Sequence, residues 1–337
     1  MSSGPGCQSG SGEGVSPLDP HSLATSLTPA LIEQCDGRLS DLRWFRADWQ
    51  RGGAATARAA YVNDHGEAVD VVVKIPVSAN ELTWTRRLQQ CPLDVDENGI
   101  RRDPVAPQLL ASGSELGGYD LAWLVIEKLA SGPLGAHWKE GDIRRMAEAA
   151  ARFYALTSDF PMHGEPIRED WPQLVAAARE SVRTNHIPEE QRWRVALKSL
   201  NAILSDVVEF WRSRVVDTWV HGDLHPANAM CRSDAPGAYV TLIDLDRVRP
   251  GHWIEDAIYL ERLHWVMPDR IKTEKPVREI ADARKALGLA HDQHTVRLAL
   301  ARRMLLAATA PRFLSTEGNP VHLAACLSRL ESGLREW

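Results

Sequence analysis

The sequence predicts an α+β fold with two lobes, a small antiparallel β-rich lobe followed by a larger, mainly helical one. A chain of 337 residues exceeds the usual size of a single compact core. Between residues 40 and 130, short apolar runs alternate with turn residues such as Asn63-Asp-His-Gly66, a pattern typical of strands. From residue 140 onward, apolar residues recur at the spacing of helices.

The N-terminal end precedes both lobes. Residues 1–25 are rich in Gly, Ser and Pro, and they contain few large apolar residues whose burial could offset the entropy of ordering the chain. We therefore expect a disordered tail over 1–25. Thr28 and Pro29 have the residue types of a helix N-cap and a first helical position, so a short helix is expected to begin there.

The first lobe is expected over residues 26–126 and a hinge over 127–133, where Ala130-Ser-Gly-Pro133 breaks the pattern. The apolar runs of the first lobe predict strands over 42–49, 57–62, 69–75 and 121–126, and a helix over 80–88.

The second lobe is expected over residues 134–337. Its periodicity predicts helices over 143–156, 171–183, 191–216, 257–266, 296–310 and 320–334. Strands at 218–221 and 238–244 interrupt this helical pattern. A short run at 227–231 precedes the second strand, with turn residues between them, so 227–244 is expected to form a hairpin.

The composition restricts the possible partners and location. A net charge of -6 argues against a nucleic-acid partner and is compatible with cationic substrates. The five cysteines are scattered and form no CxxC pair, as expected of free thiols in a reducing cytoplasm. No apolar run approaches the length of a membrane span, and no secretory pattern is evident. We expect a cytoplasmic protein with no membrane partner, and composition leaves monomer or dimer undecided.

The residues suited to chemistry are concentrated in His221-Gly-Asp-Leu-His-Pro-Ala-Asn228 and in Leu-Ile-Asp-Leu-Asp at 242–246. In the expected hairpin, Asn228 and Asp244 approach one point. Their amide and carboxylate oxygens suit Mg²⁺, which takes phosphate oxygens as further ligands. Asp223 lies on the loop beside them, where it can orient an attacking hydroxyl or accept its proton. His221 and His225 have no third nitrogen or sulfur ligand nearby, so we expect them to form structural hydrogen bonds.

These two segments resemble the aminoglycoside phosphotransferase and choline kinase-like family, a small-molecule branch of the protein-kinase-like fold. The resemblance implies that Asp223 is the catalytic base and that Asn228 and Asp244 bind the metal. Gly222 stands where protein kinases carry Arg, which favours the small-molecule branch. Asp256 matches a family position that supports the catalytic loop. The alternative role of Asp256 is an N-cap of the helix expected at 257.

A site of this kind also needs a strand lysine that holds the nucleotide phosphates and a helix glutamate that orients it. Lys74, within an apolar strand, and Glu81, on the next expected helix, have these positions. Glu67 or Glu97 could pair with Lys74 instead. The segment Arg51-Gly-Gly-Ala-Ala-Thr56 lies where a phosphate-covering loop is expected, and an ordinary hairpin turn is the competing interpretation. A GxxxxGK[ST] loop is absent from the sequence, which argues against the P-loop class.

Residues 124–129 are similar to the family's strand that leads into the hinge. The resemblance implies that Ile126 flanks the adenine pocket. It also implies that the backbone of Glu127 and Leu129 forms hydrogen bonds with the adenine edge. The resemblance further implies that the first lobe binds the nucleotide co-substrate, ATP or GTP, and that the second lobe carries the catalytic and acceptor sites.

The predicted function is Mg²⁺-dependent transfer of the γ-phosphate of ATP or GTP to a hydroxyl of a small molecule. The alternative is a nucleotide-binding pseudokinase that acts as a regulator or scaffold. All the core polar positions of the motif are filled, which argues for catalysis.

Residues that could recognise the acceptor favour different classes of acceptor. Acidic residues in the helical lobe would suit an aminoglycoside or an aminoalcohol, namely Asp159, Glu165, Asp246, Glu255 and Glu261. Trp253 and Trp265 could form a cage for a quaternary ammonium, although packing in the core is the simpler role. Arg247 and Arg249 would instead suit an acceptor with a carboxylate or phosphate. The sequence therefore leaves the acceptor open.

Overall fold

The computed structural model describes residues 20–45, 54–91, 103–235, 237–290 and 293–337. The chain folds into two compact units. One unit comprises residues up to Val77 together with Ala111–Val125, and the other comprises Ser78–Leu110 together with Ile126–Trp337. None of the described helices combines the length and apolar character that crossing a membrane requires.

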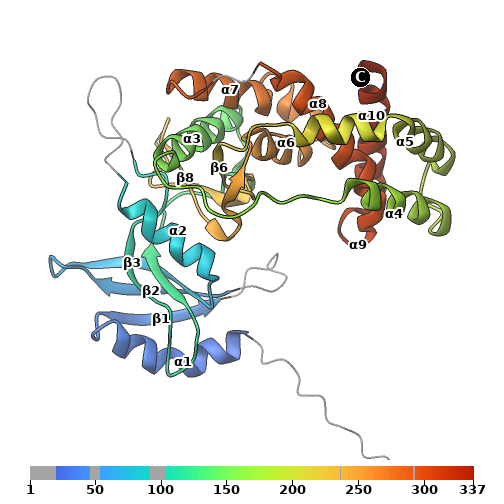
Figure 1. Cartoon of the computed structure of the whole chain (residues 1–337). Coiled ribbons are helices and arrows are strands. Elements are labelled where there is room, and N and C mark those ends of the chain that lie inside the picture. The colour runs from blue at the N-terminus through green and yellow to red at the C-terminus, as the bar shows by residue number, and fades with distance from the viewer. Residues whose placement is uncertain (1–19, 46–53, 92–102, 236, 291–292) are drawn as a thin grey trace, which may run out of the picture. The chain divides into compact units, whose positions relative to one another are not determined.

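The first unit is built around an antiparallel sheet. Strands β1 (Leu39–Phe45), β2 (Ala55–Val62) and β3 (Ala68–Ile75) are consecutive neighbours, and β5 (Trp123–Glu127) and β4 (Leu109–Gly113) complete the sheet order β1-β2-β3-β5-β4. On β3, Val71, Val73 and Ile75 are buried, as expected of a strand with one covered face. Helix α1 (Pro20–Gln34) packs against β1 and β2, as Figure 1 shows.

Helix α1 begins eight residues before Thr28, so the predicted start at Thr28 is wrong. Ala24, Leu27 and Leu31 form its buried stripe, and two of these residues precede Thr28. The Thr28 hydroxyl donates to the Ala24 carbonyl (3.2 Å) and accepts from Trp44 Nε1 (3.0 Å) instead of capping a helix. Of the disordered tail predicted over 1–25, residues 20–25 are helical, and residues 1–19 lie outside the described residues.

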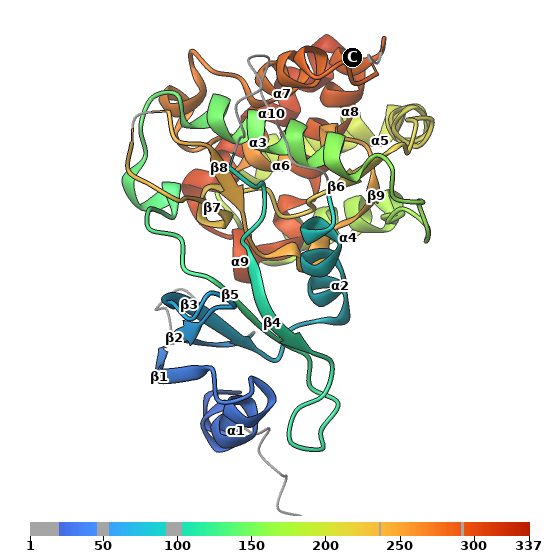
Figure 2. The ribbon, with the colours of Figure 1, turned by 90° about the vertical axis from the view of Figure 1, so that its left-hand side faces the viewer.

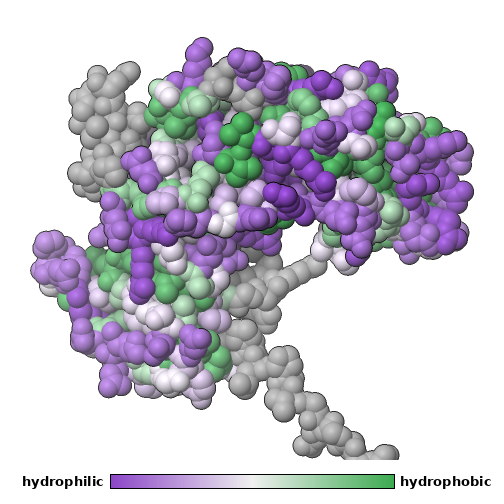
Figure 3. Space-filling view, in the orientation of Figure 1, coloured by the Kyte–Doolittle hydropathy of each residue, from purple (hydrophilic) through white to green (hydrophobic). Residues whose placement is uncertain are grey.

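The second unit is mainly helical, and the apolar stripes of its helices meet in one core. Figures 1 and 2 both show α3 beside α7, and α8 packs on α10. On α5, buried residues recur at helical spacing from Trp193 to Trp211, whereas Figure 3 shows mainly hydrophilic residues on its outer face. The helices are α2 (Ala79–Gln89), α3 (Asp142–Thr157), α4 (Trp171–Thr184), α5 (Glu190–Arg212), α6 (Ile254–Arg262), α7 (Pro276–Ala286), α8 (Thr295–Thr309), α9 (Leu314–Glu317) and α10 (Pro320–Glu336).

Two short strand pairs position the polar residues of the second unit. Strand β6 (Thr218–Val220) pairs with β9 (Arg249–Gly251), and β7 (Ala229–Cys231) pairs with β8 (Val240–Leu242) in the expected hairpin. Helix α3 packs on β6 and β8, so the strand ends are supported by the helical core.

The predicted α+β fold class is confirmed, but some elements were missed. Strand β4 was missed because its sequence, Leu-Leu-Ala-Ser-Gly, has partly exposed residues throughout and no alternation of apolar and polar residues. Strand β9 contains Pro250, a residue that usually argues against a strand. Helix α7 was also not expected. The boundaries predicted for the lobes and the hinge stay predictions.

Candidate active site

The loop after β6 is fixed by the buried ring of His221. His221 Nδ1 accepts from the backbone N–H of Asp223 (3.3 Å), and Nε2 lies 3.1 Å from the carbonyl of Ile243. Burial lowers the pKa of His221 below its ordinary value of 6.5, although Asp256 and Asp223 oppose this effect. The ring is therefore neutral at pH 7, with Nε2–H donating to Ile243. His221 thus joins the loop to the β7–β8 hairpin, as its predicted structural role requires.

Gly222 occupies a position that no residue with a side chain fits. Its φ is +78°, in the left-handed region. A Cβ added at Gly222 would lie 2.3 Å from the carbonyl oxygen of Arg247, which is backbone and cannot rotate away. Close packing of two backbone segments therefore requires glycine at this position. The same glycine was the residue that disfavoured a protein kinase in the sequence analysis.

The carboxylate of Asp256 fixes the same loop through hydrogen bonds. Its Oδ2 accepts from the N–H of His221 (2.8 Å) and from the hydroxyl of Tyr154 (2.9 Å), and its Oδ1 accepts from the N–H of Gly222 (2.8 Å). Burial raises the pKa of Asp256 above its ordinary value of 3.8, although His221 and the two backbone N–H groups oppose this. Helix α6 begins at Ile254, so the alternative role of Asp256 as an N-cap at 257 is wrong.

Asp223 has several donors around its carboxylate. Asn228 Nδ2 donates to the Asp223 carbonyl (3.1 Å) and lies 3.4 Å from Oδ2, and His225 Nε2 lies 3.6 Å from Oδ2. The hydroxyl of Tyr259 also donates to this carboxylate. Burial raises the pKa of Asp223, but the hydrogen bonds from His225 and Tyr259 and the charge of Arg247 outweigh it, so the pKa falls to about 2. Asp223 is therefore an anion at physiological pH.

The two residues predicted to bind metal lie at the same end of the hairpin, with Asn228 just before β7 and Asp244 two residues after the end of β8. The N–H of Ile243 donates to the carbonyl of Asn228 (3.0 Å), and Asp244 is the next residue. Because Asn228 turns Nδ2 toward Asp223, its Oδ1 is directed to other partners. Asp244 has a φ of +63°, a conformation that costs energy for a residue with a side chain and often marks a functional position. One amide oxygen and one carboxylate suit a hard cation that phosphate oxygens complete, so the donor set fits Mg²⁺.

Helix α2 carries Glu81 and is attached to the segment that follows Asp244. Ser78 caps α2 by accepting from the N–H of Glu81 (3.0 Å). Asn80 Nδ2 donates to the carbonyls of Asp246 (2.6 Å) and Val248 (2.9 Å). Glu81 is 6% exposed, and a carboxylate so deeply buried needs a compensating partner. The structure thus fixes the helix of Glu81 to the residues behind the predicted metal ligand.

Lys74 lies on β3 in the first unit, opposite Thr56 of β2. The role predicted for Lys74 stays a prediction, as does its pairing with Glu81. Of the other candidate partners, Glu67 lies in an exposed turn with Asn63 (3.2 Å), and Glu97 lies outside the described residues. In the predicted phosphate-covering segment, residues 51–53 also lie outside the described part of the chain.

The segment predicted to bind adenine is anchored within the second unit. The N–H of Glu127 donates to the Gln108 carbonyl (2.9 Å), so this N–H already has a partner within the protein. The Glu127 carboxylate accepts from Gln108 N (2.6 Å) and from Arg232 Nε (3.1 Å), a role for its side chain that the sequence did not indicate. Ile126 and Leu129 flank these contacts in the chain, and their roles stay predictions.

Tyr259 is a residue at this site that sequence reasoning missed. It lies one helical turn after Asp256 on α6, so the position of Asp256 could have indicated it. The hydrogen bond to Asp223 and burial together raise the pKa of Tyr259, so it is protonated and can only donate to that carboxylate at physiological pH.

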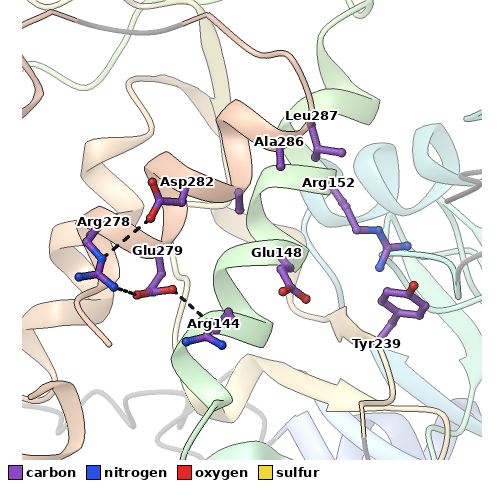
Figure 4. A pocket seen from close by; sticks show the side chains of 10 residues that line it. Arg144, Glu148, Arg152, Tyr239, Arg278, Glu279, Asp282, Ala286 and Leu287 are labelled. Carbon is purple, nitrogen blue, oxygen red and sulfur yellow. Dashed lines mark hydrogen bonds and ion pairs between the residues drawn. The ribbon is translucent and has the colours of Figure 1, made fainter. Parts of the chain in front are cut away.

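A separate cavity of about 610 Å³ lies between α3 and α7 (Figure 4). Its ionic side chains largely pair with one another. Arg278 lies 3.4 Å from Glu279 and 3.9 Å from Asp282, and Arg144 lies 3.4 Å from Glu279. None of the residues predicted to act in catalysis lines it, so we place the candidate site at Asp223 on its chemistry, not at this hollow.

Comparison with protein families gives a match over most of the chain. Residues 37–311 match the Phosphotransferase enzyme family. The chain belongs to this family. Its members are small-molecule phosphotransferases, so the prediction of a small-molecule kinase is confirmed at that level. A comparison with curated protein sequences finds no significant match.

Solved structures with the same architecture are distant in sequence. A complex of aminoglycoside phosphotransferase APH(2")-IIIa with GDP and kanamycin has a TM-score of 0.52 and 15% identity, covering 92% of this chain and 99% of that chain. A putative aminoglycoside phosphotransferase from Ralstonia eutropha JMP134 has a TM-score of 0.54 and 12% identity, covering 92% and 97%. Choline kinase from Cryptosporidium parvum Iowa II has a TM-score of 0.50 and 13% identity, covering 93% of both chains. These likenesses show that this phosphotransferase has the protein-kinase-like fold.

Proposed function

We propose that this phosphotransferase moves the γ-phosphate of ATP or GTP to a hydroxyl of a small molecule in a Mg²⁺-dependent reaction. The observation that carries the proposal is the Asp223 carboxylate, held as an anion beside the Asn228–Asp244 pair by a loop that His221 and Asp256 fasten. In a family of phosphotransferases, this set of groups supplies a hydroxyl-orienting anion and oxygen ligands for a hard cation.

Asp223 would orient the acceptor hydroxyl and receive its proton late in the reaction. The acceptor oxygen forms a bond to the γ-phosphorus while the bond from phosphorus to the bridging oxygen of the nucleotide breaks. A carboxylate with a pKa of about 2 is a weak base, so it accepts the proton once bond formation has made the hydroxyl acidic. Catalysis of this kind depends on positioning, which the fixed loop provides.

Asn228 and Asp244 would hold the metal. Bound Mg²⁺ would neutralise charge on the phosphate oxygens. Asp244 follows β8 and has a left-handed backbone conformation, so the direction of its side chain does not follow the alternation of the strand.

Lys74 and Glu81 would position the nucleotide phosphates, and Ile126 and the backbone of Glu127 and Leu129 would bind the base. The phosphotransferase complexes with GDP support a nucleotide co-substrate, and they leave ATP and GTP as alternatives here. One of those complexes contains kanamycin, and another neighbour is a choline kinase, which supports a small molecule with a hydroxyl as the acceptor class that we propose.

Magnesium-dependent stabilisation by nucleotide tests the proposal. At a nucleotide concentration of 100 times Kd, binding should add roughly 2.7 kcal/mol to the stability of the folded protein. We expect ATP or GTP to raise Tm with Mg²⁺, and expect less of a rise with EDTA or in Asp244→Ala. Release of ADP or GDP with pooled hydroxyl acceptors then separates an enzyme from a pseudokinase, which would show stabilisation without transfer. No stabilisation by either nucleotide would contradict the proposal.

A further inference from the structure

We propose that Arg247 selects an acceptor that carries an anionic group, a carboxylate or a phosphate, near the hydroxyl to be phosphorylated. This inference rests on the proposed function and narrows its acceptor class. It concerns the part of the site where Arg247 contacts Gly222, the residue before Asp223.

The backbone of Arg247 has a fixed position against the catalytic loop. Its carbonyl oxygen lies 2.3 Å from the point where a Cβ of Gly222 would be, so the two backbones are in direct contact. From the other side, Asn80 holds the carbonyls of Asp246 and Val248, the two neighbours of Arg247. The Arg247 side chain therefore begins at a backbone position that contacts Gly222, the residue before Asp223. Hydrogen bonds on both sides of Arg247 fix this segment.

The guanidinium of Arg247 is exposed and is not committed to a carboxylate. It forms no hydrogen bond or ion pair with another described residue. Its charge nevertheless acts on Asp223 and Tyr259, and it contributes to lowering the pKa of both groups. A cation within electrostatic reach of the catalytic carboxylate is thus available to a ligand.

Neighbouring arginines are committed in a different way. Arg249 donates to Glu255 (2.7 Å), and Arg214 also donates to Glu255 (3.1 Å). Arg262 pairs with Glu317. Among these side chains, Arg247 is the one left to bind something that the protein does not supply.

The acidic residues that would favour an amine acceptor are in part neutralised internally. Glu255 is shared by two arginines, and Glu261 accepts from Arg303 through both oxygens (2.7 and 2.6 Å) and from Trp265 Nε1 (3.2 Å). Both carboxylates are buried. Trp253 and Trp265, the possible cage residues, are 2% and 4% exposed and belong to the core. A planar guanidinium that is open to solvent instead matches a carboxylate or phosphate through paired, charge-assisted hydrogen bonds.

Sets of hydroxyl acceptors that carry acidic, neutral or basic groups test the proposal. The acid set contains gluconate, glycerate and glucose 6-phosphate, the neutral set contains glucose and glycerol, and the amine set contains glucosamine, serinol, choline and kanamycin. Transfer from ATP or GTP with Mg²⁺ is measured for the wild type, Arg247→Lys and Arg247→Glu. Arg179→Glu is the control, because Arg179 is exposed on α4 and undergoes the same change of charge.

We expect the wild type to transfer phosphate to the acid set. In Arg247→Glu, kcat/KM for acids relative to neutral acceptors should fall at least tenfold. Arg247→Lys should retain part of the wild-type kcat/KM for acids. The ratio of kcat/KM for gluconate to kcat/KM for glucose 6-phosphate distinguishes a preference for carboxylate from a preference for phosphate. Preference for the amine set with no change in Arg247→Glu would overturn the inference and leave the proposed function standing. An equal loss on all sets would also overturn it, since Arg247 would then act on Asp223 and not on the acceptor. Transfer to no set contradicts the inference as well, and nucleotide stabilisation in the same samples shows separately whether the nucleotide chemistry stands.

Discussion

Gly222, Asp223 and Tyr259 show how the site is determined residue by residue. Gly222 is required because the carbonyl of Arg247 fills the space of a side chain, and Tyr259 keeps one face of Asp223 hydrogen bonded. The Asp223 carboxylate, which we propose to be catalytic, thereby has a low pKa. Such positioning is the main contribution a protein makes to phosphoryl transfer.

Gly222→Ala should damage the catalytic loop more than a glycine substitution elsewhere at positive φ. Both Gly222 (φ +78°) and Gly141 (φ +93°) pay the left-handed cost of roughly 1–2 kcal/mol when they gain a Cβ. A Cβ at Gly222 also clashes with backbone, whereas one at Gly141 meets nothing within 4 Å. We expect a fall of at least about 100-fold in turnover for Gly222→Ala, by analogy with sub-ångström misplacement of reacting groups. Comparable turnover and denaturation midpoints in both variants would contradict this explanation of Gly222.

At the scale of elements, three segments are joined by a buried carboxylate. Glu255 on α6 binds Arg214, which follows α5, and Arg249 of β9. Helix α6 also carries Asp256 and Tyr259, so this ion cluster anchors the element that holds the catalytic loop.

Glu255→Gln should destabilise the protein by about 3 kcal/mol, because it leaves the largely buried Arg214 and the partly buried Arg249 without their counter-charge. Burial raises the pKa of Glu255, but Arg249, Arg302 and Arg214 lower it more, so it lies below the ordinary value of 4.5. A carboxyl with a depressed pKa stabilises the folded state above its unfolded pKa and loses that contribution as pH falls through the folded value.

Urea unfolding of the wild type and of Glu255→Gln between pH 7 and pH 3 measures this effect. The difference in unfolding free energy should be constant near neutrality and should shrink below about pH 4.5. Glu209→Gln, at an exposed position of α5, is the charge-matched control and should differ little from the wild type. A difference that grows toward acid pH would show that the stabilising form is not the ionised one.

Most helices with strong apolar periodicity were predictable from the sequence, with α7 as an exception, and so was the hairpin that presents Asn228 and Asp244. Elements without such a pattern were not, as β4 and β9 show. Contacts between distant segments were also beyond prediction, because no local pattern encodes them. Examples are Asn80 with the carbonyls behind Asp244, and Arg232 with Glu127. The start of α1 was misplaced because Thr28 and Pro29 match a helix start while Ala24 and Leu27 continue the buried stripe upstream.

At the scale of the whole molecule, the family match spans residues 37–311 and so covers parts of both compact units. Asp223, Asn228 and Asp244, the residues proposed to define the reaction, belong to the second unit, whereas Lys74 belongs to the first. Because we assign the reaction to Asp223 and the acceptor choice to Arg247, we expect the two properties to be separable by mutation.

The most direct test of the central claim measures phosphoryl transfer and nucleotide affinity together in Asp223→Ala. Because Asp223 orients the acceptor hydroxyl and does not belong to the proposed nucleotide-binding set, turnover should fall by about 10³-fold, while Kd for the nucleotide with Mg²⁺ changes by less than about threefold. Asp234→Ala, at an exposed position in the turn of the same hairpin, should retain turnover. Transfer in Asp223→Ala at the wild-type rate would contradict the assignment of Asp223 and with it the account of the site.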